Sequence, residues 1–184
     1  MKKTMLLYAI AIVMASCNNE KKDGGDKKEN TMSAAETKQE RNKKTIAASM
    51  EAFAKRDVDG MVKDAAPGYI DYGDETTPPS SNLDSTKAFI KMLLNSIGNY
   101  KASNAQLIAD GDYVFYYADW TGTFKNDLMG FKATGKPIKY KDCDIFKFNE
   151  DGKITEHHSI QNMGALFTAS AMMNGKGLQY VTAT

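Results

Sequence analysis

Apolar positions recur with a helical period through the first half of the chain. Between residues 36 and 56 they fall on a single stripe, which is typical of a helix that packs one face on a core. A second, shorter helix is expected after Asp57, which can cap it. A third is expected with Asp84 or Ser85 as its cap, and Gly98 should end it. The first half is therefore predicted to be mainly helical.

The period changes to that of β-strands after Gly98. Segments rich in β-branched and aromatic residues follow one another, separated by turn signals such as Asp151-Gly152. These segments are 105–109, 113–124, 137–148 and 153–160, and a shorter one stands earlier, at 69–72. Helices followed by consecutive strands predict an α+β domain with an antiparallel sheet. We expect the long strands to curl around the three N-terminal helices into a cone, whose open end forms a pocket.

The N-terminal segment has the pattern of an exported protein. Two lysines precede an apolar run over residues 5–15, which has the length of a secretory signal and is too short to span a bilayer. Met14-Ala15-Ser16-Cys17 then resembles a lipobox, with Met14 where leucine is usual. We expect a signal peptide at 1–16 and lipid on Cys17, which would anchor the protein at the cell envelope, outside the cytoplasm. The alternative is an ordinary secretory signal with an incidental cysteine.

A charged stretch follows the cysteine and has little apolar surface to bury, so residues 17–35 are predicted to be a lipidated, disordered tether. The folded domain is expected at 36–175, closed by a short helix over 163–173. Residues 176–184 read as a tail or a last strand.

Charge and cysteine content exclude several classes of protein. Removal of the signal peptide takes away two of the 24 basic residues and none of the 23 acidic ones. The mature chain is then nearly neutral and has no basic patch, so nucleic-acid binding is not expected. Lipid on Cys17 would leave Cys143 unpaired, so no structural disulfide is expected. The two histidines are adjacent and face opposite ways on a strand, so neither a metal site nor a cofactor is predicted.

Several motifs occur in an order that is familiar from one family. They are Tyr69-Ile70-Asp71-Tyr72-Gly73, Trp120-Thr121-Gly122-Thr123, Ala133-Thr134-Gly135-Lys136-Pro137 and the hairpin from Asp144 to His157. Together they resemble the SnoaL-like (polyketide cyclase-like) branch of the nuclear transport factor 2-like superfamily, over roughly residues 36–170. The resemblance implies the cone-shaped fold and its pocket. It also shows departures: Asn162 stands where the cyclases carry an acid/base aspartate, Tyr72 where histidine is frequent, and His158 where tryptophan is common.

Candidate chemistry follows from alternation along the last strand. Glu156, His158 and Asn162 should share one face, and His157 the other. If the family register holds, the first set points into the cone. His158 is then the candidate acid or base, because imidazole titrates near neutral pH. The alternative is an inert His158 that only fills the tryptophan position.

A second candidate is a carboxylate paired with a phenol. Asp144 beside Tyr72 or Tyr116 could reproduce the pairing of ketosteroid isomerase, which belongs to the superfamily resembled here. The competing interpretation is surface ion pairing, because Lys141 and Lys147 flank Asp144.

The aromatic residues suggest two kinds of surface. Tyr116, Trp120 and Tyr140, with Asn162, are expected to bind a small apolar or aromatic ligand in the pocket. Aromatic residues on the outer sheet face could instead form a homodimer interface.

Two functions therefore stay open. One is a membrane-tethered small-ligand-binding or accessory domain without chemistry. The other is an acid/base enzyme (an isomerase, aldol-type cyclase or dehydratase) in which His158 or Asp144 is the base and Tyr72 or Tyr116 the hydrogen-bond donor.

Overall fold

The computed structural model describes the backbone of residues 26–172 and the side chains of residues 37–168. The predicted signal peptide, the lipidation site Cys17 and the predicted tail at 176–184 lie outside the described residues. Within the described part, no helix is both long and apolar enough to cross a membrane.

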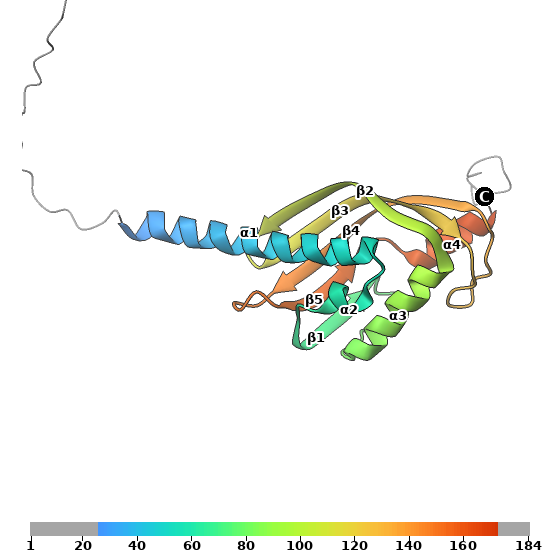
Figure 1. The fold of residues 1–184 in the computed structure, drawn as a ribbon, viewed down its shortest axis with the longest axis horizontal. Helices are drawn as coiled ribbons and strands as arrows, with labels where there is room; N and C mark the ends of the chain where they lie inside the picture. The colour runs from blue at the N-terminus through green and yellow to red at the C-terminus, as the bar shows by residue number, and fades with distance from the viewer. Residues whose placement is uncertain (1–25, 173–184) are drawn as a thin grey trace, which may run out of the picture.

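A five-stranded curled sheet and four helices make up the domain (Figure 1). The helices are α1 (Asp26–Ala54), α2 (Val58–Val62), α3 (Leu83–Ser96) and α4 (Met163–Met172). The strands are β1 (Ala65–Gly73), β2 (Ile97–Asp110), β3 (Tyr113–Phe124), β4 (Pro137–Phe148) and β5 (Ile154–Ser159), in the sheet order β1-β5-β4-β3-β2. The predicted α+β class is confirmed.

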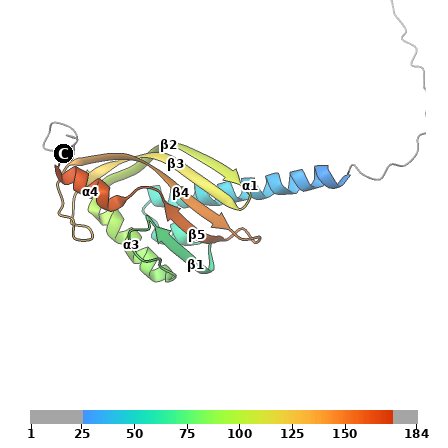
Figure 2. The same cartoon turned by 180° about the vertical axis from the view of Figure 1, so that it is seen from behind.

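The long strands β2, β3 and β4 arch over α1, with α3 below them and α4 at one end of the sheet (Figures 1 and 2). The core lies in the space under the arch. Its most buried apolar side chains come from the helices, from the inner face of the sheet and from the loop between β3 and β4: Ile46, Leu94, Ile97, Val114, Phe124, Leu128, Ile138, Phe148, Ile154 and Phe167. Alternating burial along β3 and β4 shows that the sheet has one packed face and one outer face.

Several predicted boundaries are confirmed. β3 and β4 begin and end at the predicted residues, and α4 begins at the predicted residue and continues to Met172, the last residue that the structure describes. Asp57 caps α2, since its carboxylate accepts a hydrogen bond from the Gly60 N–H at 3.0 Å.

The prediction for the start of α3 was wrong. The cap is Asn82, whose Oδ1 accepts hydrogen bonds from the backbone N–H groups of Asp84 (2.9 Å) and Ser85 (3.2 Å). The helix ends at Ser96 with Ile97 as its C-cap, so Gly98 stands directly after the cap, as predicted, and Ile97 already pairs with Phe124 in the sheet. β2 therefore begins well before the predicted start at residue 105.

Two further features differ from the prediction. α1 begins at Asp26, so residues 26–35 are helical, although we expected a disordered tether up to residue 35. Five of these ten residues are lysine, glutamate or alanine, which are good helix formers. In addition, β1 pairs with β5 in parallel, so the sheet is mixed. The long chain segment between these two strands makes a parallel arrangement accessible.

The outer sheet face exposes some apolar side chains. Tyr113 is 39% exposed and Ile108 is 54% exposed. Cys143, which pairs with Tyr117 in the sheet, lies on the same face and is a free, half-buried thiol. A homodimer through this face stays a prediction.

Candidate functional site

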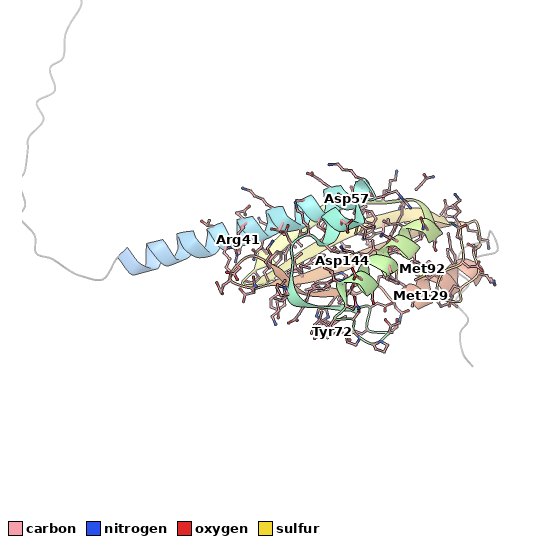
Figure 3. The ribbon with its side chains drawn as sticks, turned by 60° about the horizontal axis from the view of Figure 1, so that its bottom comes forward. Arg41, Asp57, Tyr72, Met92, Met129 and Asp144 are labelled. Carbon is pink, nitrogen blue, oxygen red and sulfur yellow. The ribbon has the colours of Figure 1, made fainter. Side chains whose placement is uncertain are left out.

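A cavity of about 520 Å³ lies between the curled sheet and the helices. Most of its wall is apolar, with side chains from α1, α3, α4 and the inner sheet face, among them Phe53, Leu93, Trp120, Phe146 and Phe167. Phe89 and Met129 also line it and are 37% and 50% exposed, so they mark its opening. Figure 3 shows Asp144 in the interior of the domain and Met129 near its periphery.

A β-bulge decides which side chains of β5 enter this cavity. Phe148 pairs with Ile154 and Lys147 with Glu156, so Thr155 is an extra residue opposite the β4 strand. The extra residue reverses the alternation after Ile154. Glu156 consequently points outward, where it accepts a hydrogen bond from Lys147 at 2.8 Å, and the next residue, His157, points into the cavity.

His157 joins two carboxylates from different strands. Its Nδ1 lies 2.9 Å from Asp71 Oδ1 on β1, and its Nε2 lies 3.4 Å from Asp144 Oδ1 on β4. The three side chains are between 14% and 20% exposed. A protonated imidazole can donate to both partners, so the arrangement is a carboxylate–imidazolium–carboxylate chain along the cavity wall.

The pKa values reflect this arrangement. Burial alone would lower the pKa of His157, but the hydrogen bonds and charges of Asp144 and Asp71 outweigh it and raise the pKa to about 10. Burial raises the pKa of Asp144 above its usual range, and the contact with His157 compensates only in part. Burial would raise the pKa of Asp71, but the hydrogen bonds that it accepts from His157 and from the backbone N–H of Gly73 outweigh burial and lower that pKa. His157 is thus a cation at neutral pH.

Asp142 also lines the cavity, but its oxygens are occupied. Oδ1 accepts from the backbone N–H groups of Cys143 (2.7 Å), Ile160 (3.2 Å) and Gln161 (2.9 Å), and Oδ2 accepts from the Ser159 hydroxyl at 2.8 Å. These bonds tie the end of β5, and the turn that leads to α4, to the middle of β4. Asp142 therefore has a structural role.

Several polar groups in the cavity wall have no hydrogen-bond partner among the described residues, including Asp71 Oδ2 and the buried Thr86 Oγ1. Asp144 Oδ2 makes no hydrogen bond with any described residue, and Trp120, which is 5% exposed, has an unpartnered indole Nε1. The hydroxyls of Tyr100 and Tyr140 instead bond to each other. Burial raises the pKa of both phenols, so they are neutral donors.

Comparison with known proteins places this arrangement in a family. Residues 44–169 match the model of the SnoaL-like polyketide cyclase family. The chain belongs to this family. No curated protein matches it.

Solved structures share the fold of this SnoaL-like chain. A protein from Xanthomonas campestris pv. campestris, provisionally named a polyketide cyclase, superposes with a TM-score of 0.64 at 18% identity, covering 71% of this chain and 97% of that one. AclR from Streptomyces galilaeus, provisionally named a hydroxylase, superposes with a TM-score of 0.59 at 22% identity, covering 71% of this chain and 84% of that one. An NTF2-like protein of unknown function from Burkholderia pseudomallei K96243 superposes with a TM-score of 0.57 at 20% identity, covering 70% of this chain and 98% of that one. At these identities the likeness establishes the fold alone.

The SnoaL-like cavity contains some of the predicted site residues. Trp120, Tyr140 and Asp144 line it, as expected. The alternative of surface ion pairing for Asp144 is wrong, because Lys141 pairs with Asp119 and Lys147 with Glu156 on the outer face.

The prediction that His158 points into the cone was wrong, because it ignored the bulge at Thr155. The His158 ring stacks on Tyr72 outside the cavity wall, with ring centroids 4.4 Å apart and planes within 3°. Its Nδ1 lies 3.6 Å from Glu75 Oε1. Tyr72 borders the cavity, but its ring is committed to this stack.

Two predicted ligand-binding residues lie elsewhere. Asn162 is not in the cavity wall; its Oδ1 accepts from the Ala165 N–H at 2.7 Å and so caps α4. Tyr116 is 6% exposed and packs in the core beside Trp120, so it is not part of the wall either.

Asp71, His157 and Tyr100 are site residues that the sequence interpretation missed. Asp71 lies two residues after the buried Tyr69 and therefore shares its face, which was a usable signal. His157 could be found only by allowing for a bulge. Among the described residues, no group of three or more potential ligands could hold a metal ion.

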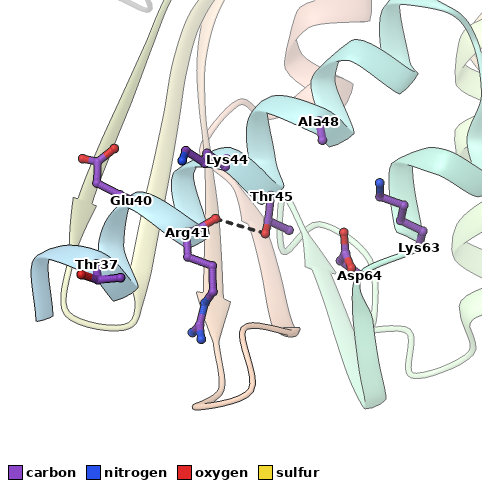
Figure 4. Close-up of a pocket in the computed structure, with 8 residues that line it drawn as sticks. All are labelled: Thr37, Glu40, Arg41, Lys44, Thr45, Ala48, Lys63 and Asp64. Atoms are coloured by element: carbon purple, nitrogen blue, oxygen red, sulfur yellow. Dashed lines mark hydrogen bonds between the residues drawn. The ribbon is translucent and has the colours of Figure 1, made fainter. Parts of the chain in front are cut away.

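A second hollow lies on the surface beside α1 (Figure 4). This groove of about 680 Å³ is open to solvent and has mixed charge, from Glu40, Arg41, Lys44, Lys63 and Asp64. Asp64 is already bound by Lys153 at 2.6 Å. The groove has neither apolar enclosure nor a free buried polar group, so the interior cavity is the better candidate site.

Proposed function

We propose that this SnoaL-like domain binds a small, mostly apolar ligand with one polar end in the interior cavity. The observation that carries the proposal is an apolar cavity with open polar groups in its wall, among them Asp144 Oδ2 and the buried Trp120 Nε1. Ligand pockets commonly combine apolar walls with a few convergent polar groups, and buried polar atoms seldom stay unpaired.

The test is binding of a neutral, apolar fluorescent probe, N-phenylnaphthylamine. We expect saturable binding to the unmodified protein and its loss in Leu93→Trp, because Leu93 lines the cavity and the indole would fill it. Lys91→Trp is the matched control, since Lys91 lies on the same helix, exposed and outside the wall. Absence of saturable binding, or equal binding to both variants, would overturn the proposal.

A second function is favoured by one observation, the raised pKa of the buried Asp144 carboxyl. Such a carboxylate can abstract a proton beside a carbonyl, with the neighbouring tyrosine hydroxyls as donors to the oxygen. This proton transfer would appear in NMR spectra as Asp144-dependent deuterium exchange into a cyclic ketone such as tetralone. An exchange rate no higher than that in buffer alone would refute this second function.

We also propose that the domain is held at the cell envelope by lipid on Cys17. The support is the sequence pattern Met14-Ala15-Ser16-Cys17 behind an apolar signal segment. Cys17→Ser should abolish lipid attachment, so the protein should move from the detergent phase to the aqueous phase in Triton X-114 partitioning. Cys143→Ser should leave partitioning unchanged. A Cys17→Ser protein that still partitions with detergent would refute the anchor.

A further inference from the structure

The cavity carries an excess of negative charge. The charged side chains in its wall are Asp71, Asp74, Asp142, Asp144 and His157. Neither lysine nor arginine occurs among the described residues that line it. The one cation, His157, is already shared by Asp71 and Asp144. A bound ligand therefore meets uncompensated carboxylates in a largely apolar surrounding, where charges interact strongly.

Two of these carboxylates, Asp71 and Asp144, have an oxygen that accepts no hydrogen bond from a described residue. Asp142 is held by three backbone N–H groups and a hydroxyl, as described above. Asp74 accepts from the backbone N–H of Met163 at 2.9 Å and from the backbone N–H and hydroxyl of Thr76. Asp71 accepts from His157 at 2.9 Å and from the Gly73 N–H at 3.0 Å, both through Oδ1, so it is the more firmly held of the two. Asp144 has a single contact, 3.4 Å long, and its other oxygen is free inside the fold.

Three aromatic side chains, Tyr100, Trp120 and Tyr140, line the same cavity as Asp144. Tyr140 precedes Asp144 by four residues on the inner face of β4, and Trp120 pairs with Tyr140 across β3. The Trp120 ring lies 5.1 Å from the ring of Tyr100, whose hydroxyl bonds to Tyr140. Aromatic faces attract cations through the ring quadrupole, most strongly where water is excluded. Carboxylate and aromatic wall thus favour the same kind of ligand group.

We propose that the polar end of the ligand is a cationic amine, seated between Asp144 Oδ2 and the aromatic wall of Tyr100, Trp120 and Tyr140. This inference rests on the proposed binding function and names its ligand class. An ammonium donates a hydrogen bond to the free oxygen and also balances the excess charge, whereas a hydroxyl would supply only the bond. A carboxylate ligand would meet like charges.

The raised pKa of the Asp144 carboxyl supports this assignment, since burial without a full counter-charge disfavours its ionised form. An ammonium beside it would hold the carboxylate ionised and occupied. The inference therefore favours ligand binding over proton transfer as the role of Asp144.

The test compares three ligands that share one apolar body and differ in charge: naphthylethylamine, naphthylethanol and naphthylacetate. With the full chain at neutral pH, calorimetry should show the amine binding about tenfold or more tightly than the alcohol, with the acetate weakest, because like charges repel in the cavity. If the alcohol or the acetate binds as tightly as the amine, the proposal is overturned while the binding function stands. If none of the three binds, the binding function fails as well.

Asp144→Asn keeps the shape of the side chain and removes its charge. In this variant the amine should lose about tenfold in affinity and the alcohol should change little, so the preference should disappear. Asp119→Asn is the matched control, because Asp119 pairs with Lys141 and Asn104 outside the cavity. Retention of the amine preference in Asp144→Asn would overturn the proposal. Should that variant fail to fold by circular dichroism, the comparison of the three ligands on the unmodified protein decides.

Discussion

Replacement of His157 by glutamine is expected to lower the free energy of unfolding by about 3–5 kcal/mol, the usual cost of removing one partner from a buried ion pair. The variant would leave Asp71 and Asp144 facing each other without their shared cation. Urea unfolding followed by circular dichroism measures the loss. His158→Gln is the matched control, because His158 lies next in sequence but points outward, and we expect it to cost less than about 1 kcal/mol. Similar losses in both variants would refute the buried ion pair.

The same ion pair predicts the pH dependence of stability. His157 has a folded-state pKa of about 10 against an ordinary value of 6.5. The contribution of the His157 charge to the free energy of unfolding is therefore complete below pH 6.5 and is lost as the pH rises toward 10. Asp71 has a lowered pKa, so its contribution is present above its ordinary value of 3.8 and is lost as the pH falls through the folded-state value. The free energy of unfolding should be greatest between pH 3.8 and pH 6.5. His157→Gln should remove most of its decline above pH 6.5. A flat profile in the unmodified protein would contradict the assignment.

Asp142→Ala is expected to cost about 3–5 kcal/mol, because each buried group left without its partner costs about 1–3 kcal/mol. Asp142 is 7% exposed, and without its carboxylate the Cys143 N–H, the Gln161 N–H and the Ser159 hydroxyl would lose their acceptor, while the Ile160 N–H would keep only its bond to the Cys143 carbonyl at 3.3 Å. Asp142→Asn keeps one carbonyl acceptor and should recover part of the loss. Amide hydrogen exchange should speed up at Ile160 and Gln161 in the alanine variant.

The control for Asp142 is Asp119→Ala on the neighbouring strand, where the carboxylate pairs with an exposed lysine. It should cost less than about 1 kcal/mol. An equal cost for the two alanine variants, or unchanged exchange at Ile160 and Gln161, would mean that Asp142 does not hold the turn in place.

Local patterns predicted the middle of the sheet well. The bounds of β3 and β4 were predicted to the residue because their apolar alternation is long and ends at strong turn signals. The cap of α3 was misplaced, because Asn82, Asp84 and Ser85 are all good caps and local sequence does not rank them. The early start of β2 depends on pairing with Phe124, which is distant in sequence. Non-local contacts of this kind leave little trace in a local pattern.

The candidate site was predicted only in part, because some of its contacts are also non-local. Trp120, Tyr140 and Asp144 were found because β3 and β4 alternate without interruption across the inner face. Asp71 and His157 come together from strands separated by most of the domain, and their contact depends on the parallel pairing of β1 with β5. Asn162 was assigned to the wall by extending the alternation of β5, but the strand ends at Ser159.

The bulge at Thr155 bears on how such cavities diversify. If Thr155 paired regularly with Lys147 instead of bulging, Glu156 and His158 would face inward in place of His157 and Ser159, with no amino acid changed. The gain or loss of a bulge in β5 is thus a route by which relatives could acquire a different set of acids and bases in one step. Equivalent residues in this strand are best matched by the direction of their side chains, since an ungapped alignment would pair the wrong histidines.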